Sequence, residues 1–383
     1  RAPKDAWASI LAVWNDELQK VEFFESIALP FGSVCAVMAF NRMARALRII
    51  MSSLFLLVNT NFFDDFCQLE VDALCDSSWQ TAELVMKLLG WRISMSEDKR
   101  LPFAPEFSML GAVVDLSHTA QGVVNVRNKE SRVKDIGRLV DEVCGKSLVP
   151  MSPVETLKGR LLYAAGHTFG RCTQLAIQMV SRLARRGPML MVDDSFRGVL
   201  RSAFACLSAA KPRAVSAWSR QPPVIIFTDG ACEENGQAVT HGATLFDPEC
   251  GASLMFGDSV PHEWVDRWRS QGKKQLICQA EIFPILVAKS TWPQLISCRA
   301  VLWFVDNNSA LAAVIRSFSP IVENFELLVL NAELDVKLQS LNWYSRVPSK
   351  SNLSDSPSRM DFSELAAKGF QRCQPNYETL TVK

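Results

Sequence analysis

The sequence predicts a mixed α/β protein, α+β overall, and three observations support this class. Short apolar runs rich in β-branched and aromatic residues alternate with longer stretches whose apolar residues recur at helical spacing. Acidic residues stand where several of the short runs end, which is typical of a site at the edge of a sheet. The composition, with 48 % hydrophobic and 21 % charged residues over 383 positions, is that of a globular chain of two or three domains.

Residues 1–150 combine strand-like runs with a helical stretch near residues 76–89. Within this region the sequence FFDDF places Asp64 and Asp65 side by side between apolar runs. Such a pair is typical of the tip of a β-hairpin. Because adjacent carboxylates repel each other and burying either charge without a partner is unfavourable, a bound cation is the alternative interpretation.

The segment from Ser152 to about Arg186 is expected to be helical. Ser152 suits the cap of a helix, Pro153 suits the first helical position, and Glu155 suits the first turn. Apolar residues then recur at helical spacing. The dipeptide Pro222–Pro223 interrupts regular structure, so we expect a domain boundary there.

Charge is distributed unevenly along the chain, although its total is only +1. Between Lys158 and Arg220 there are eleven Lys and Arg and two Asp, a net charge of +9. Residues 223–360 carry fifteen acids and eleven bases, a net charge of −4. A basic segment followed by an acidic one favours a chain that binds a polyanion with the first segment and metal ions with the second. A solvated basic helix face is the alternative.

After residue 223 the pattern is one of strands alternating with helices. Strands are expected at residues 224–227, 241–246, 252–256, 300–305 and 341–347. A helix is expected at residues 277–290, with Pro284 in its first turn or at a kink. Trp264 and Trp268 stand four residues apart, which favours packing in a core or lid over stacking on a base. Four acids lie at strand ends, on the expected helix or in the closing segment: Asp229, Glu281, Asp306 and Asp355.

Four carboxylates that converge at one edge of a sheet need cations, because each raises the pKa of the others. Mg²⁺ prefers oxygen ligands and is usually held by a few carboxylates together with substrate phosphates. Two such ions about 4 Å apart stabilise both the attacking and the leaving oxygen of a phosphodiester displacement. We therefore expect two Mg²⁺ ions at this site, with Mn²⁺ as an alternative.

The sequences IIFTDGACEENG, QAEIFPIL, LWFVDNNSAL and SRVPSKSNLSDSPSR resemble the four conserved blocks of a retroelement ribonuclease H domain. The resemblance covers about residues 224–359 and implies a mixed sheet flanked by helices that hydrolyses the RNA strand of RNA·DNA hybrids. It assigns catalysis and metal binding to Asp229, Glu281, Asp306 and Asp355. Asn352 matches an Asn that precedes the last acid in such domains. Lys350 and Arg359 flank that acid and are candidates for contacting substrate, with solvated surface charges as the alternative.

The sequences ALPFG, FFDDF, LLGWRISMSEDKR and FSMLGAVVDL occur in the order of the palm of a reverse transcriptase, and SPVETLKGRLLYAAGHTFGRC resembles its helical thumb. This looser resemblance, to DIRS-like or gypsy-like retrotransposons, covers about residues 1–190. It implies that Asp64 and Asp65 hold catalytic metal ions and that Gly32 lies near the substrate. The third carboxylate of such a site is expected where RAPKDAW has Ala2, so we expect an impaired polymerase site. Three basic residues of the helical region are further candidates for substrate contacts: Arg182, Arg185 and Arg186.

Taken together, the sequence predicts a partial palm (1–150), a helical thumb and basic connection (151–222), a ribonuclease H-like domain (223–360) and a C-terminal tail (361–383). We expect part of a longer polyprotein whose partner is an RNA·DNA hybrid or a single-stranded template. No signal peptide and no apolar run of membrane-spanning length is seen, so an intracellular location, cytoplasmic or nuclear, is expected. Two alternatives stay open, namely a catalytically dead nucleic-acid-binding remnant and a ribonuclease H-like nuclease that acts on another nucleic acid.

Overall fold

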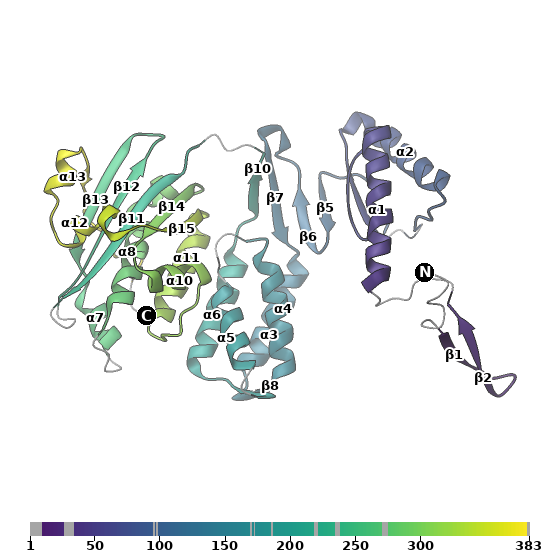
Figure 1. Cartoon of the computed structure of the whole chain (residues 1–383), viewed down its shortest axis with the longest axis horizontal. Helices are drawn as coiled ribbons and strands as arrows, with labels where there is room; N and C mark the ends of the chain where they lie inside the picture. The colour runs from purple at the N-terminus through teal and green to yellow at the C-terminus, as the bar shows by residue number, and fades with distance from the viewer. Residues whose placement is uncertain are drawn as a thin grey trace. The chain divides into compact units, whose positions relative to one another are not determined.

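The computed structural model describes residues 10–26, 34–94, 96, 99–168, 171, 173–184, 187–217, 221–233, 238–269 and 275–380. Helices and strands alternate along these residues, which confirms the predicted mixed α/β class (Figure 1). The chain divides into two compact units, Arg1–Ala104 and Pro105–Lys383, and each is described by itself.

The described part of the first unit contains two antiparallel hairpins and two α-helices. Their bounds are β1 Ile10–Asn15, β2 Lys20–Glu25, α1 Val34–Phe55, β3 Val58–Phe62, β4 Asp65–Leu69 and α2 Cys75–Leu88, with a 3₁₀ turn at Asp72–Leu74. A small core joins α1 and α2 to the hairpin of β3 and β4, and it is formed by Leu47, Met51, Leu57, Val85 and Met86. The helix expected near residues 76–89 is confirmed by α2.

The hairpin tip expected at the Asp-Asp pair is also confirmed. Phe62 on β3 pairs with Asp65 on β4, so Phe63 and Asp64 form the turn between the strands. Phe63 has a φ of 52°, in the left-handed region that such tight turns require.

The second unit begins with an antiparallel sheet of order β10-β7-β6-β5 and a bundle of four helices. The strands are β5 Glu106–Met109, β6 Ala112–Asp115, β7 Val123–Asn128 and β10 Arg213–Ser216. The helices are α3 Glu130–Cys144, α4 Met151–Ala165, α5 Gln174–Leu183 and α6 Asp194–Ala209, and their apolar faces form one core. A short ribbon of β8 Leu148–Pro150 and β9 Met189–Met191 closes the end of the bundle.

Two details of the helical prediction were wrong. The helix begins two residues earlier than expected, at Met151 rather than Pro153, and Ser152 does not cap it. The reason is that the Met151 N–H donates to Pro188 O at 2.8 Å, so the chain enters the helix directly from β8. The expected single helix is also divided, because α4 ends at a turn that begins with Gly166, before α5 starts.

The rest of the second unit is built on a six-stranded mixed sheet of order β15-β14-β11-β12-β13-β16. Strands β11 Val224–Glu233, β12 Ala238–Asp247 and β13 Ala252–Ser259 form an antiparallel meander. Strands β14 Ala300–Val305 and β15 Leu341–Arg346 run parallel to β11, and β16 Gln371–Arg372 runs parallel to β13. The predicted mixed sheet flanked by helices is therefore confirmed.

Seven helices accompany this sheet in the described part of the chain. They are α7 His262–Arg269, α8 Ile277–Thr291, α9 Pro293–Ile296, α10 Asn308–Arg316, α11 Asn324–Leu338, α12 Asp355–Ser358 and α13 Ser363–Ala367. Helix α8 packs on β11 and β12 and is covered in turn by α10 and α11 (Figure 1). Every residue of α8 from Cys278 to Ser290 is buried. Of the two placements expected for Pro284, the first turn was wrong, since the residue lies in the middle of this helix.

The segment that follows α13 lies on the core of this sheet. The Cys373 N–H donates to Met255 O at 2.9 Å, and the Asn376 N–H donates to Thr291 Oγ1 at 2.9 Å. Leu380 is buried in the same apolar core as α8. Among the residues described, no helix has the length and apolar character needed to cross a membrane.

Candidate metal centre

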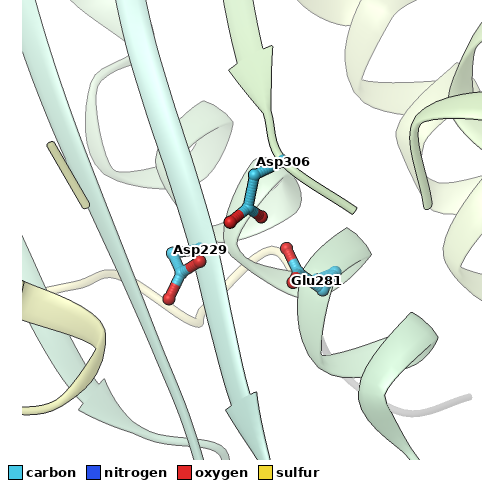
Figure 2. A group of neighbouring side chains, drawn as sticks. All are labelled: Asp229, Glu281 and Asp306. Carbon is cyan, nitrogen blue, oxygen red and sulfur yellow. The ribbon is translucent and has the colours of Figure 1, made fainter. Parts of the chain in front are cut away.

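Three acidic side chains from three separate elements meet beside the six-stranded sheet. Asp229 lies on β11, Glu281 lies in the first half of α8, and Asp306 follows the last residue of β14. One carboxylate oxygen from each lies within 4.8 Å of the others, and Figure 2 shows the three groups facing one another. Because β11 and β14 are parallel neighbours, their carboxyl-terminal halves bring the two aspartates to the same region.

A glycine allows the helix to approach the strand at this point. A Cβ atom on Gly230 would lie 2.2 Å from Ala280 O, so no larger residue fits there without displacing α8. Pro284 has no N–H with which to bond the Ala280 carbonyl, its partner four residues earlier in an ordinary helix. The Gly230 N–H donates to the Glu281 carboxylate. These local features bring Glu281 next to the residue that follows Asp229.

Burial and mutual repulsion shift the acidity of two of the three groups. Burial, followed by the charges of Asp229 and Asp306, raises the pKa of Glu281 to about 9. Burial also raises the pKa of Asp229 to about 6; a hydrogen bond from Ser358 acts against this, and the charges of Asp306 and Asp355 add to it. A site that holds these groups ionised at neutral pH therefore needs added positive charge.

The donor set fits a divalent cation of the hard, oxygen-seeking kind. Glu281 Oε2 and Asp306 Oδ1 are buried and have no hydrogen-bond partner among the described residues. Buried carboxylate oxygens without partners are unfavourable unless a cation binds them. Clustered carboxylates without sulfur or imidazole ligands are the environment that Mg²⁺ prefers.

Asp355 and Asn352 lie next to this cluster, on the segment that carries α12. Asp355 is outside the group of three but close enough for its charge to act on Asp229. It is half exposed, and its Oδ1 lies 3.4 Å from Arg359 Nε. Asn352 is buried and donates to Asp229 Oδ1 at 3.2 Å and to Thr228 O at 3.1 Å. The contact that the structure provides for Asn352 is therefore with a carboxylate of the cluster.

The basic residues named from the sequence lie on the surface or outside the described residues. Lys350 and Arg359 are exposed near the cluster, and Arg182 is exposed at the end of α5. Arg185 and Arg186 lie outside the described residues. Other members of the basic stretch serve the fold, since guanidinium groups donate to backbone carbonyls at about 3 Å in three cases: Arg171, Arg197 and Arg213.

The second candidate site, at the Asp-Asp pair of the first unit, has a different environment. Asp64 and Asp65 are exposed at the tip of the hairpin. Gly32 and Ala2 lie outside the described residues. Within the described part of the chain, the group of three acids on the six-stranded sheet is the one set of side chains placed to share a metal ion.

The tryptophan pair on α7 lies in the core, which confirms the preferred interpretation. Trp264 and Trp268 are 3 % and 1 % exposed, so neither ring is available to stack on a base. Both rings pack against Phe283 of α8, with centroids 5.6 Å and 5.7 Å away.

Sequence reasoning missed several small residues that build the centre. Gly230, Gly242 and Gly257 allow close backbone approach, and Ser358 donates to Asp229 Oδ2. Gly230 follows Asp229 directly, which was a signal for a close contact at that acid. The two other glycines lie on β12 and β13, and only the strand register relates them to the site.

No family model and no curated protein sequence matches the chain. Among solved structures, a foamy viral protease-reverse transcriptase in complex with double-stranded DNA aligns at 11 % identity and a TM-score of 0.44, over 90 % of this chain and 54 % of that one. The same viral protein in complex with an RNA/DNA hybrid aligns at 10 % identity and a TM-score of 0.44, over 92 % of this chain and 43 % of that one.

The RNase H1 of the halophilic archaeon Halobacterium salinarum aligns at 15 % identity and a TM-score of 0.26, over 36 % of this chain and 97 % of that one. The chain thus spans about half the length of the viral proteins. At these scores and identities, the likenesses assign no function to the chain.

Proposed function

We propose that residues 223–360 form a ribonuclease H-type nuclease that hydrolyses the RNA strand of RNA·DNA hybrids with two Mg²⁺ ions, or with Mn²⁺ in their place. The observation that supports this most is the convergence of three carboxylates from β11, α8 and the end of β14. Each of these acids stands in a sequence block that resembles the corresponding block of retroelement ribonuclease H domains.

In this proposal the three converging acids provide the ligands, and Asp355 is the fourth. When bound, the metal ions neutralise the acids and stabilise the attacking and leaving oxygens of the phosphodiester. The chain's own residues fix the arrangement: Gly230 allows Glu281 to approach, and Asn352 holds one oxygen of Asp229. The high pKa values of the metal-free site mean that binding must displace protons.

The proposed substrate is a hybrid because the resemblance is to enzymes that cut one. Such a protein distinguishes RNA through its 2′-hydroxyl groups and gains most of its affinity from phosphate contacts. Exposed Lys350 and Arg359 are the proposed phosphate contacts near the cut. Arg182, Arg185 and Arg186 are further proposed contacts.

We further propose that the first 222 residues derive from the palm and thumb of a reverse transcriptase, in a longer retroelement polyprotein of DIRS-like or gypsy-like type. Asp64 and Asp65 are the proposed metal ligands of its polymerase site. Because Ala2 stands where the third carboxylate is expected, template-directed synthesis should be impaired. Clear product in a primer-extension assay with Mg²⁺ or Mn²⁺ contradicts this part of the proposal.

The nuclease proposal is tested with the full chain and a labelled RNA·DNA hybrid in the presence of Mg²⁺. Asp229→Asn should abolish cleavage, whereas Glu364→Gln, a change at an acid of the same unit that is 67 % exposed, should leave it intact. Parallel assays with double-stranded DNA and double-stranded RNA identify the substrate. Binding of the hybrid without any cleavage supports the alternative of a catalytically dead nucleic-acid-binding remnant. Preferred cleavage of another duplex supports the alternative of a ribonuclease H-like nuclease with a different nucleic-acid substrate.

A further inference from the structure

Asp229 belongs to a row of three residues that crosses the sheet. It lies directly opposite Gly242 on β12, and Gly242 lies directly opposite Gly257 on β13. Residues that are paired in this way point to the same face of a sheet. The row therefore consists of one carboxylate and two positions without a side chain, which leaves a shallow groove beside Asp229.

The short helix α12 fills this groove at backbone distance. A Cβ atom on Gly242 would lie 2.5 Å from Ser358 N, and one on Gly257 would lie 2.0 Å from Pro357 O. Any larger residue at either position would collide with backbone, which cannot move aside as the end of a flexible side chain can. The two glycines thus determine how closely α12 approaches the strand that carries Asp229.

At this distance Ser358 reaches the metal cluster. Its hydroxyl donates to Asp229 Oδ2, while Asn352 Nδ2 donates to the other oxygen, Oδ1, at 3.2 Å. The hydroxyl has a single proton and also lies 2.8 Å from Asp355 O, but a carboxylate is the stronger acceptor of the two. Each oxygen of Asp229 therefore has one donor from the segment around α12, and its remaining lone pairs stay free for a cation.

We propose that Ser358 is a positioning residue that fixes the orientation of the Asp229 carboxylate for metal binding, and that Gly242 and Gly257 exist to place it there. The inference rests on the proposed metal site and adds a residue to it. Groups that hydrogen-bond to a metal ligand orient it, and their loss typically weakens metal affinity about 10- to 100-fold. The competing explanation is that Ser358 is an ordinary buried hydroxyl whose loss affects folding alone.

The chain offers a matched control in Ser354. Both serines are 0 % exposed and lie on the same segment, but the Ser354 hydroxyl donates to Phe227 O at 2.8 Å and, among the described contacts, does not touch Asp229. Mn²⁺ affinity of the full chain, measured by calorimetry in the absence of nucleic acid, is the readout. Ser358→Ala should weaken it about 10-fold or more, and Ser354→Ala should leave it within about twofold, although both should lower the melting temperature.

Further variants at Ser358 distinguish a weaker metal site from a general loss of folding. Ser358→Cys keeps a similar volume but replaces the hydroxyl with a much weaker donor, so it should show the same loss of Mn²⁺ affinity, while Ser358→Thr should retain much of it. Asp229→Asn identifies the site in the same titration. If wild type binds Mn²⁺ through Asp229 and the Ser358 variants bind it equally well, the positioning role is overturned and the nuclease proposal stands. If wild type binds no Mn²⁺ at Asp229, the metal site and this inference fail together.

Discussion

Asp229 on β11 and Glu281 on α8 hold carboxylate oxygens within 4.8 Å of each other, and burial raises the pKa of both groups. A carboxyl group whose pKa is higher in the folded than in the unfolded state contributes stability at low pH and loses it as the pH rises. For Glu281 this loss extends from about 4.5 to about 9, so the metal-free protein should become less stable over this range, and Mg²⁺ should counteract the loss.

Glu281→Gln should therefore stabilise the metal-free protein at about pH 8, by on the order of 2 kcal/mol, because Glu281 must take up a proton on folding at this pH and Gln need not. Urea denaturation with EDTA measures the change, and the same variant should gain no stability from added Mg²⁺. Glu364→Gln serves as the exposed control. A Glu281→Gln protein that is stabilised by Mg²⁺ as strongly as wild type contradicts the assignment of this acid.

Gly257→Ala should destabilise the protein by about 1–3 kcal/mol, because its Cβ would lie 2.0 Å from Pro357 O. It should also weaken metal binding, since α12 must move away from Asp229. Gly198→Ala in helix α6 is the matched control, because nothing lies within 4 Å of its Cβ position. That change should stabilise the protein by up to about 1 kcal/mol. If the two substitutions change the melting temperature equally, the close packing of α12 against Gly257 is contradicted.

His241 should make the protein sensitive to acid. It is completely buried, which lowers its pKa to about 4. Tyr377 donates to Asp258 Oδ2 at 3.0 Å, so His241 Nε2 donates to the Tyr377 oxygen at 2.9 Å. The Nδ1 atom has no hydrogen-bond partner among the residues that the structure describes. A group whose pKa is lower in the folded state stabilises above its unfolded value of 6.5 and loses this contribution as the pH falls towards 4.

Between about pH 7 and pH 5 this single histidine should remove about 2 kcal/mol of stability. Denaturation curves of wild type and His241→Phe at the two pH values measure this effect, and the variant should show a smaller difference between them. An unchanged difference would show that other groups cause the acid sensitivity.

Lys289 and Asp335 form a buried ion pair, so the effects of substituting them on the free energy of unfolding should depend on each other. Lys289 Nζ donates to Asp335 Oδ1, to Asn331 Oδ1 at 2.7 Å and to Tyr344 OH at 3.1 Å, and it is 0 % exposed. Burial alone would lower the pKa of Lys289, but the charge of Asp335 and the neighbouring Tyr344 raise it. The ammonium group is therefore charged inside the core.

Asp335→Asn should destabilise the protein by about 3–5 kcal/mol, because it leaves this charge without its counter-ion. Adding Lys289→Met to that variant should recover part of the loss, and chemical denaturation of the two single variants and the double variant measures the coupling. Strict additivity of the two substitutions contradicts the ion pair.

The sequence predicted the elements whose local pattern agrees with their tertiary environment. Strand β14 has the expected bounds, residues 300–305, because its apolar run is buried within a sheet of parallel neighbours. Strand β11 begins where expected but continues to Glu233, since pairing with β12 overrides the weak strand preference of Gly230. An interior Pro284 was one of two placements that the sequence left open, since a proline is tolerated in the first turn and elsewhere interrupts the helix.

For the candidate site, the acids were predictable and their support was not. Asp306 follows the last residue of β14 as expected, whereas Asp229 lies within β11 and not at its end. All three acids stand in the family-like blocks of the sequence. Ser358 and the glycine pair contribute only through register and packing between residues distant in the sequence, which one sequence does not encode in any local pattern. The role of Asp355 stays a prediction, since it lies at the rim of the cluster.

Helix α8 has a consequence for the dynamics of the centre. Because it is covered by the sheet on one side and by α10 and α11 on the other, its backbone amides should exchange with deuterium only when the whole unit opens. We therefore expect Glu281 to be carried by a slowly exchanging helix, whereas the side chains of Asp355 and Arg359 are partly exposed. Because α12 packs at backbone distance on Gly242 and Gly257, we expect the backbone of α8 and α12 to be rigid, while the Asp355 and Arg359 side chains keep rotational freedom in solvent.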